Sequence, residues 1–210
     1  MGDYSQNFGL PWFGNEQPGQ TYYYSPLGIY IFGMANYATE VLTAYVYDEG
    51  EGAKGGDNVA SLIYKYLEDE GVIKEWEDSG KKPGKSCTFV FDNCAGQNKN
   101  KCVIRMACMW LIDMGIYKTV IVLFLIAGHT KNICDRRFKD VKKECHHSNI
   151  FSMTKLIELM NRSEHVKAIL VTHEVFYNWN VRLDKVYKAL KPIQHTRIMC
   201  LLVMLLGLVS

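Results

Sequence analysis

Two spacings of apolar residues alternate along the chain, and each predicts a different kind of element. Short runs rich in β-branched and aromatic residues are typical of strands, and these runs cover residues 22–36, 39–52, 87–91 and 117–128. Apolar residues three and four positions apart predict helices, and these stretches cover a segment that starts near 57 and then 98–114, 135–145, 152–163 and 181–191. The order predicts an α/β fold in which one mixed sheet carries helices on its faces.

Several boundaries can be predicted from single residues. Asp57 is a candidate N-cap for the first helix, and Gly115 is expected to end the helix that starts at Asn98. The first two strands are predicted to pair as a hairpin. The run 117–128 is the most apolar stretch before the tail, so we expect it to be a strand covered on both faces.

Length and composition favour one folded domain. The chain has 210 residues, of which 48% are hydrophobic and 22% charged, with a net charge of only +2, so it can bury a substantial core and its net charge leaves the partner open. We expect residues 1–195 to form the domain and 196–210 to be an apolar tail. That tail is too short for an ordinary transmembrane helix, and packing on the domain is favoured over a membrane anchor.

The seven cysteines are an odd number and lie in apolar or helical segments, which favours a reducing compartment. A zinc site made by Cys134, Cys145, His146 and His147 is an alternative. No CxxC pair accompanies these residues, so buried thiols beside a surface histidine pair are preferred.

Acidic residues stand where predicted strands end. Asp92 follows the run 87–91, Asp135 follows 117–128 after a polar loop, and Asp3 and Asp48 are further candidates. Ligands collect at the carboxyl ends of strands in such sheets, and three converging carboxylates repel one another unless cations bridge them, which implies magnesium or manganese. The alternative is that Asp92 and Asn93 only form an Asx turn or cap the next helix.

The strings "FDNCAGQNKN" and "AGHTKNICDRRF" resemble the paired motifs of an uncharacterised family of eukaryotic transposon-derived proteins. The amino-terminal string "DYSQNFGLPWFGNEQPGQTYYYSPL" is similar to the opening strand and Pro-Gly loop of that family. The resemblance runs from about Asp3 to at least Lys191. These strings are long and ordered, which makes them more specific than an isolated acidic triplet.

The resemblance implies the catalytic domain of a DDE-type transposase with a ribonuclease H-like fold, a five-stranded mixed sheet flanked by helices. It implies Asp3, Asp92 and Asp135 as catalytic residues and metal ligands. They would hold two Mg²⁺ or Mn²⁺ ions roughly 3.5–4 Å apart for phosphodiester hydrolysis and strand transfer at transposon ends. The partners would be transposon-end and target DNA, with a homo-oligomer as the active form, no membrane and a nuclear location. So little chain precedes Asp3 that a truncated first strand is one interpretation.

Other residues are assigned supporting roles. Those that would orient the second acid or hold phosphates are Asn93, Gln97, Asn98 and Lys99, and those that would contact the scissile phosphate or protonate the leaving group are His129 and Lys131. Residues expected to contact the DNA backbone are Arg136, Arg137 and Lys139, followed by Lys142 and Lys143. The alternatives are helix capping for the first groups and a solvated basic face for the last.

Two other classes of protein stay open. A nuclease or exonuclease of the same broad fold would also use clustered acids, but the sequence lacks the Asp-x-Glu pair usual on its first strand, and Ser5 stands at the second acidic position. A domesticated or inactive transposase-derived domain would bind DNA or protein without cutting. Asp48 is expected to lie well outside the acid cluster, on a strand antiparallel to the first.

Overall fold

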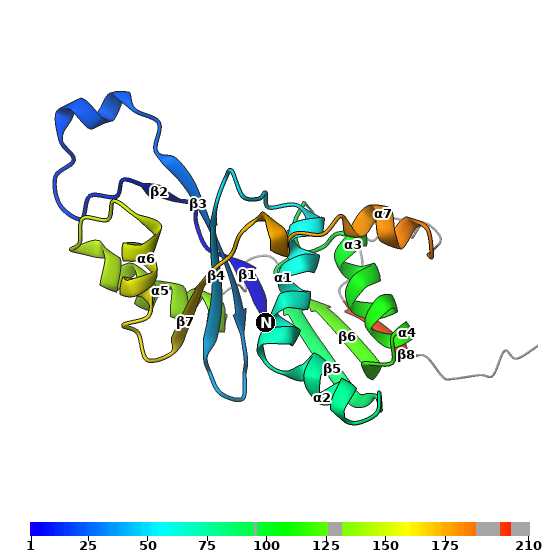
Figure 1. The fold of residues 1–210 in the computed structure, drawn as a ribbon. Helices are drawn as coiled ribbons and strands as arrows, with labels where there is room; N and C mark the ends of the chain where they lie inside the picture. Colours follow the sequence, from blue (N-terminus) through cyan, green and yellow to red (C-terminus); the bar gives the residue numbers. More distant parts are fainter. Residues whose placement is uncertain (95, 126–131, 188–197, 203–210) are drawn as a thin grey trace, which may run out of the picture.

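The structure is a computed structural model that describes residues 1–94, 96–125, 132–187 and 198–202 (Figure 1). Its strands are β1 Gly2–Tyr4, β2 Phe8–Leu10, β3 Leu27–Ala35, β4 Leu42–Asp48, β5 Gly84–Phe91, β6 Tyr117–Phe124, β7 Val166–Leu170 and β8 Ile198–Leu202. Its α-helices are α1 Gly56–Asp69, α2 Val72–Asp78, α3 Lys101–Ile104, α4 Leu111–Asp113, α5 Ile133–His146, α6 Met153–Met160 and α7 Trp179–Asp184. Short 3-10 helices are η1 Gly19–Tyr23 and η3 His173–Val175, and η2 Arg105–Trp110 is a π-helix.

The described strands form one mixed sheet, which confirms the predicted α/β class. Their order is β7-β4-β3-β1-β5-β6-β8, and β2 pairs with β3. The pairs β1–β5, β5–β6 and β4–β7 are parallel, whereas β1–β3, β3–β4 and β6–β8 are antiparallel. The sheet has eight strands and not five, because β2, β7 and β8 extend the five central strands.

Helices pack on both faces of the sheet and bury two separate cores (Figure 1). One core lies between the sheet and α1, α3, α4 and α7, and includes Phe32 and Tyr45. The other lies between the sheet and α5 and α6, and includes Leu42 and Phe138. Strand β4 is buried on both faces, because Tyr45 belongs to the first core and Val46 to the second.

Strand β6 departs from the prediction of cover on both faces. Val120, Val122 and Phe124 are buried, whereas the alternating Ile121 and Leu123 are partly exposed. The reason is that α5 and α6 pack over β3, β4 and β7 (Figure 1), so they do not reach the far half of the sheet.

The predicted helix over 98–114 is present as three consecutive pieces, α3, η2 and α4. Asn100 caps its start, since its side chain accepts a hydrogen bond from Cys102 N at 2.8 Å. Gly115 ends it in the left-handed region at φ 74°, as predicted. The N-cap of α1 is Gly55 and not Asp57, because the Asp57 carboxylate accepts hydrogen bonds from another segment.

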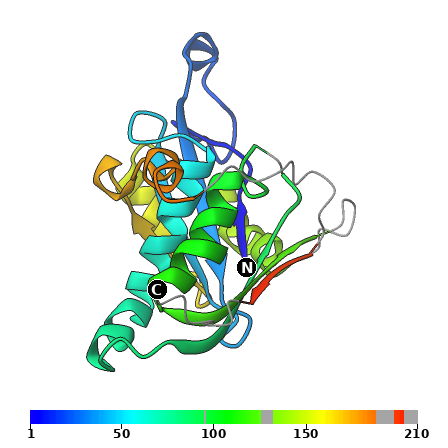
Figure 2. The same cartoon turned by 90° about the vertical axis from the view of Figure 1, so that its right-hand side faces the viewer.

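The apolar tail contributes a strand to the sheet. Residues 198–202 form β8, which lies antiparallel to β6 at the edge of the sheet (Figure 2). Within the described part of the chain, every helix is too short or too polar to cross a membrane.

Candidate active site

The first two acids lie on neighbouring strands. Gly2 of β1 is paired with Phe91 of β5 in a parallel register. Asp3 and Asp92 each follow a paired residue by one position, so they are neighbours across the two strands. A Cβ on Gly2 would lie 2.7 Å from the Phe91 ring, which places both positions on the face of the first core. Side chains alternate along a strand, so Asp3 and Asp92 occupy the opposite face, where α5 packs.

The first turn of helix α5 carries the third acid, Asp135. Asn132 is its N-cap and forms a capping box with Asp135: Asp135 N donates to Asn132 Oδ1 at 2.8 Å, and Asn132 N donates to Asp135 Oδ2 at 3.5 Å. The Asn132 amide also donates to Asp3 Oδ2 at 3.4 Å. Asn132 thus joins the first and third acids. It was not assigned a supporting role from the sequence, although its spacing of three residues to Asp135 is the signature of a capping box.

The charges of the three acids act on one another. The pKa of Asp3 is raised from its ordinary value of 3.8 to about 7, mainly by burial, then by the charge of Asp92 and more weakly by that of Asp135. Hydrogen bonds from Asn132 and from Tyr4 N, the latter at 2.8 Å, oppose the rise. The three acids therefore lie near enough to repel one another, and their proximity has an energetic cost.

Polar neighbours hold the second acid in place. Asp92 Oδ1 accepts a hydrogen bond from the side-chain amide of Asn98 and a longer one from Cys94 N at 3.4 Å. The latter bond is the Asx turn expected as the alternative to a catalytic role. Asn98 is fully buried, and its Oδ1 has no hydrogen-bond partner among the described residues. Lys99 Nζ donates to Asn93 Oδ1 at 2.9 Å.

The remaining candidates fall into three groups. Gln97 is half-buried, and its N–H donates to Cys94 O at 3.3 Å. His129 and Lys131 lie outside the described residues. Arg136 and Lys139 are exposed on α5, where backbone contacts were predicted.

Arg137 requires a correction. Its side chain is buried, donates to Glu40 O at 3.0 Å and pairs with the Glu40 carboxylate at 2.9 Å. The α-helical period turns this position toward the sheet, so the guanidinium ties α5 to the β3–β4 hairpin. It is not exposed to contact a DNA backbone.

Asp48 lies outside the cluster, but for a different reason from the one expected. Strand β3 is antiparallel to both β1 and β4, so β4 runs parallel to β1 and the predicted antiparallel direction is wrong. Gly33 is paired with both Asp3 and Ala44. Asp48 is therefore two strands across and four residues farther along, roughly 16 Å from Asp3 by standard strand spacings. Its carboxylate accepts a hydrogen bond from Gly50 N at 2.8 Å.

An open groove begins at Asp135, the third of the acids. It has a volume of about 570 Å³ and is lined by Asn132, Asp135 and Tyr4 together with the basic residues Arg136, Lys139 and Lys142. Anionic ligands would meet positive charge along α5 before they reach the carboxylates.

The donor set, but not its described geometry, fits a divalent cation. Carboxylate oxygens are the ligands that Mg²⁺ and Mn²⁺ prefer, and mutual repulsion of the acids would be relieved by such an ion. Within the described residues, no three His, Cys, Asp or Glu side chains are arranged to hold a metal. For the zinc alternative, burial raises the pKa of Cys134 to about 12 and that of Cys145 to about 11, which disfavours the thiolates that zinc needs.

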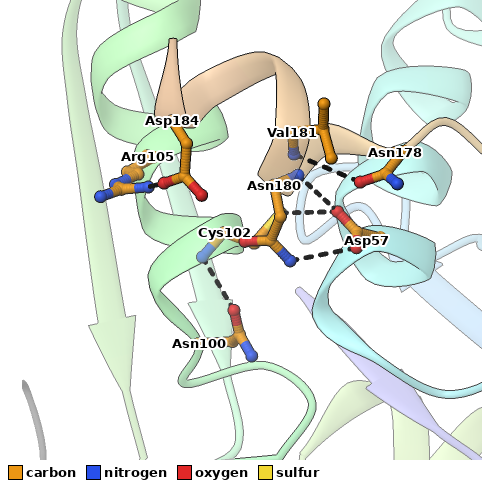
Figure 3. A network of polar contacts seen from close by, with 8 residues as sticks. All are labelled: Asp57, Asn100, Cys102, Arg105, Asn178, Asn180, Val181 and Asp184. Atoms are coloured by element: carbon orange, nitrogen blue, oxygen red, sulfur yellow. Dashed lines mark hydrogen bonds and ion pairs between the residues drawn. The ribbon is translucent and has the colours of Figure 1, made fainter. Parts of the chain in front are cut away.

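A second polar cluster attaches α7 to the rest of the domain (Figure 3). Asp57 accepts hydrogen bonds from Asn180 N at 2.7 Å and Asn180 Nδ2 at 3.0 Å. Cys102 Sγ also donates to Asp57 at 3.3 Å, and the buried Arg105 pairs with Asp184. The cluster joins α1, α3 and α7, so it is structural and lies apart from the acids.

The chain is an α/β domain in which acidic residues lie near one another on and after the central strands β1 and β5 and at the start of α5. A family described as a domain of unknown function, DUF7869, matches residues 27–201, and the chain belongs to this family. The matched range contains Asp92 and Asp135 and begins after Asp3. No curated protein and no solved structure matches the chain.

Proposed function

We propose that this chain is the catalytic domain of a DDE-type transposase with a ribonuclease H-like fold. The observation that carries the proposal is the convergence of Asp3, Asp92 and Asp135, from two adjacent parallel strands and one helix, on one face of the sheet. The resemblance of the sequence assigns the three acids to the same kinds of element. The same proposal implies action on DNA in the nucleus by a homo-oligomer.

The arrangement of the central strands also supports the proposal. Taken in chain order, β1, β3, β4, β5 and β6 would correspond to the five strands that the resemblance implies. The first and fourth of them lie side by side and parallel, which is what brings Asp3 next to Asp92. The strands β2, β7 and β8 are additions to this arrangement.

Each acid has a role that follows from its surroundings. Asp3 and Asp92 would supply carboxylate ligands to the metal ions, and Asp135 would supply another from the start of α5. The chemistry that bound Mg²⁺ or Mn²⁺ would supply here is activation of the attacking water or 3′-hydroxyl and stabilisation of the leaving oxygen. Asn132 and Asn98 position the carboxylates by hydrogen bonds. Arg136 and Lys139 would hold phosphates next to the acids.

A nicking assay tests the proposal. Supercoiled plasmid is incubated with the protein and Mg²⁺ or Mn²⁺, and nicked and joined products are counted for the wild type, Asp92→Asn and Asp135→Asn. Each variant is expected to lose more than about 100-fold in rate, because the amide keeps the size of the side chain and removes a charge that binds metal. Asp48→Asn is the matched control and should keep full activity.

Two outcomes would contradict the proposal. Nicking that survives Asp92→Asn would show that the acid cluster is not the catalytic site. Degradation of linear DNA from its ends, without nicking, would assign the domain to the exonucleases. A second candidate, a transposase-derived domain that binds DNA without cutting, is favoured by the absence of a ready metal arrangement among the described residues. It predicts DNA binding with no nicking by the wild type.

A further inference from the structure

Helix α5 is bordered by three neighbouring cavities, which we call together the α5 groove. The first is the groove beside Asp135, of about 570 Å³. The second, of about 230 Å³, lies between α5 and the segment that carries Phe8 and Trp12. The third, of about 510 Å³, lies near the end of the helix and is lined by basic residues alone. Lys142 borders all three, so the cavities follow one another along α5, which is about 20 Å long.

The α5 groove is strongly basic. The exposed cationic or titratable side chains along it are Arg136, Lys139, Lys142, Lys143, His146 and His147. Arg136 and Lys143 have carboxylate neighbours at 3.8 and 3.6 Å, in Glu40 and Asp140. Lys139 and Lys142 form no ion pair within the described ranges, and Lys142 donates only to the amide oxygen of Gln6. These two lysines are the best placed to contact phosphates.

Two aromatic side chains, Phe8 and Trp12, line the second cavity of the groove. Trp12 is 36% exposed, lines the second cavity and stacks on Phe8, with ring centroids 4.7 Å apart at 26°. Its backbone is paired with Ile150 by two hydrogen bonds of 2.8 Å. Gly14 lies so close to the chain after α5 that a Cβ would meet Ser148 N at 2.6 Å. The backbone that carries the indole is therefore anchored to the chain after α5, and the ring packs on Phe8.

Fixed aromatic rings beside a line of cations are suited to a nucleic-acid strand with free bases. Every base has a flat face that can stack on an indole, whereas in a duplex those faces are already covered by neighbouring bases. A cavity of about 230 Å³ between Trp12 and α5 offers room for a flat ring and has an apolar lining that includes Phe138 and Leu156. Basic cavities on both sides of it would hold the phosphates that precede and follow this base.

We propose that the α5 groove binds single-stranded DNA, with one base stacked on Trp12 and the backbone on Lys139 and Lys142, and that it leads the strand toward Asp135. This inference rests on the proposed function for the identity of the nucleic acid, but binding itself needs neither metal nor cleavage. It assigns Trp12 a role in recognition that the three acids do not have. A strand separated from its complement would be the preferred ligand.

The test is fluorescence anisotropy in EDTA with three labelled probes: a 20-nucleotide oligo(dT), the same strand with abasic sites, and a 20-base-pair duplex. The wild type should bind oligo(dT) more tightly than either other probe. Trp12→Ala should weaken oligo(dT) binding about 10-fold and leave the abasic strand unchanged, since only stacking is lost. Trp12→Phe keeps an aromatic face and should stay within about 3-fold of the wild type.

Lysine variants separate charge from stacking. The double variant Lys139→Ala with Lys142→Ala should weaken all three probes, and lower the slope of log affinity against log salt on the single strand by about 1.4. The matched controls are Lys167→Ala, on the exposed side of β7, and Tyr23→Ala, which is 90% exposed on η1. Both should leave the affinity for all probes unchanged.

Several results would overturn the inference. Equal affinity for oligo(dT) and the abasic strand, or a preference of the wild type for duplex, would remove the role of stacking. A dimer in light scattering that Trp12→Ala dissociates, without any effect on DNA binding, would assign the surface to a second copy of the chain. If nicking does not depend on the three acids but oligo(dT) is still preferred, the proposed function is wrong and the role of the groove stands. If nicking depends on the acids but oligo(dT) is not preferred, only the role of the groove is wrong.

Discussion

Asp3 is expected to destabilise the metal-free protein at neutral and alkaline pH. Its pKa is about 7 in the folded chain against an ordinary value of 3.8, so between about pH 4 and pH 7 the folded state binds a proton that the unfolded state has lost. Stability must therefore fall as the pH rises through this window. Asp3→Asn removes the titrating group but keeps an oxygen that can accept the hydrogen bond from Tyr4 N.

The size of the effect follows from the two pKa values. Their difference corresponds to an upper bound of about 4 kcal/mol above pH 7. Asp3 is only partly buried, and solvent near the carboxylate reduces such penalties, so we expect about 2 kcal/mol. Asp3→Asn should be more stable than the wild type by this amount at pH 8 and by nearly nothing at pH 4.

Urea unfolding in EDTA at pH 4, 6 and 8 measures the difference. Subtracting the free energy of unfolding of the wild type from that of the variant cancels the contributions of groups that titrate identically in both. Asp48→Asn is the control, because its carboxylate lies at the end of β4 outside the cluster, and it should show no gain with pH. A variant that is less stable than the wild type at every pH would refute the argument that the acids are held together at a cost.

Three further predictions concern Asn132, the cluster that attaches α7, and Arg137. Asn132→Ala should lower the free energy of unfolding by about 1–2 kcal/mol, since it removes the N-cap of α5, while Asn132→Ser should restore much of the loss; urea titration gives both values. Asp57→Ala should leave the Asn180 amides unpaired and cost about 1–3 kcal/mol, and hydrogen exchange should show faster opening of α7, whereas uniform destabilisation without local opening would contradict its role. Arg137→Ala should destabilise the domain, because Glu40 loses its buried partner, yet leave the affinity for DNA within about 2-fold; a large loss of DNA affinity in the folded variant would put the guanidinium back on the binding surface.

The central part of the fold could be predicted from the sequence because its signals are local. The β-branched runs at 87–91 and 117–128 and the helical spacing before Gly115 correspond to β5, β6 and the α3–α4 helix. The position of Asp92 at the end of a strand could be predicted because the run that precedes it is short and apolar.

Long-range pairing could not be predicted from local patterns. The direction of β4 depends on β3 lying between it and β1, which no residue near Asp48 signals. The burial of Arg137 depends on Glu40, 97 residues away. The basic residues beside Arg137 in the sequence give no sign of this contact. Strand β8 lies in a segment whose continuous apolar run has no period of its own, so its pairing with β6 was not expected.

The role of Asn132 could be predicted only in part. The capping box with Asp135 is visible as a spacing of three residues, but the hydrogen bond to Asp3 spans 129 positions. Local chemistry therefore indicates the cap, and only the fold shows that the same side chain connects two acids.

The central claim is that Asp3, Asp92 and Asp135 bind divalent cations together. Calorimetric titration of Mn²⁺ into the purified protein at pH 8 tests it directly, with Asp3→Asn, Asp92→Asn, Asp135→Asn and the control Asp48→Asn measured alongside. The account predicts saturable binding to the wild type and to Asp48→Asn, and at least a tenfold weaker affinity in each of the other three variants, because each loses one of the shared carboxylates. Mn²⁺ binding of equal affinity in the wild type and in all three acid variants would contradict it.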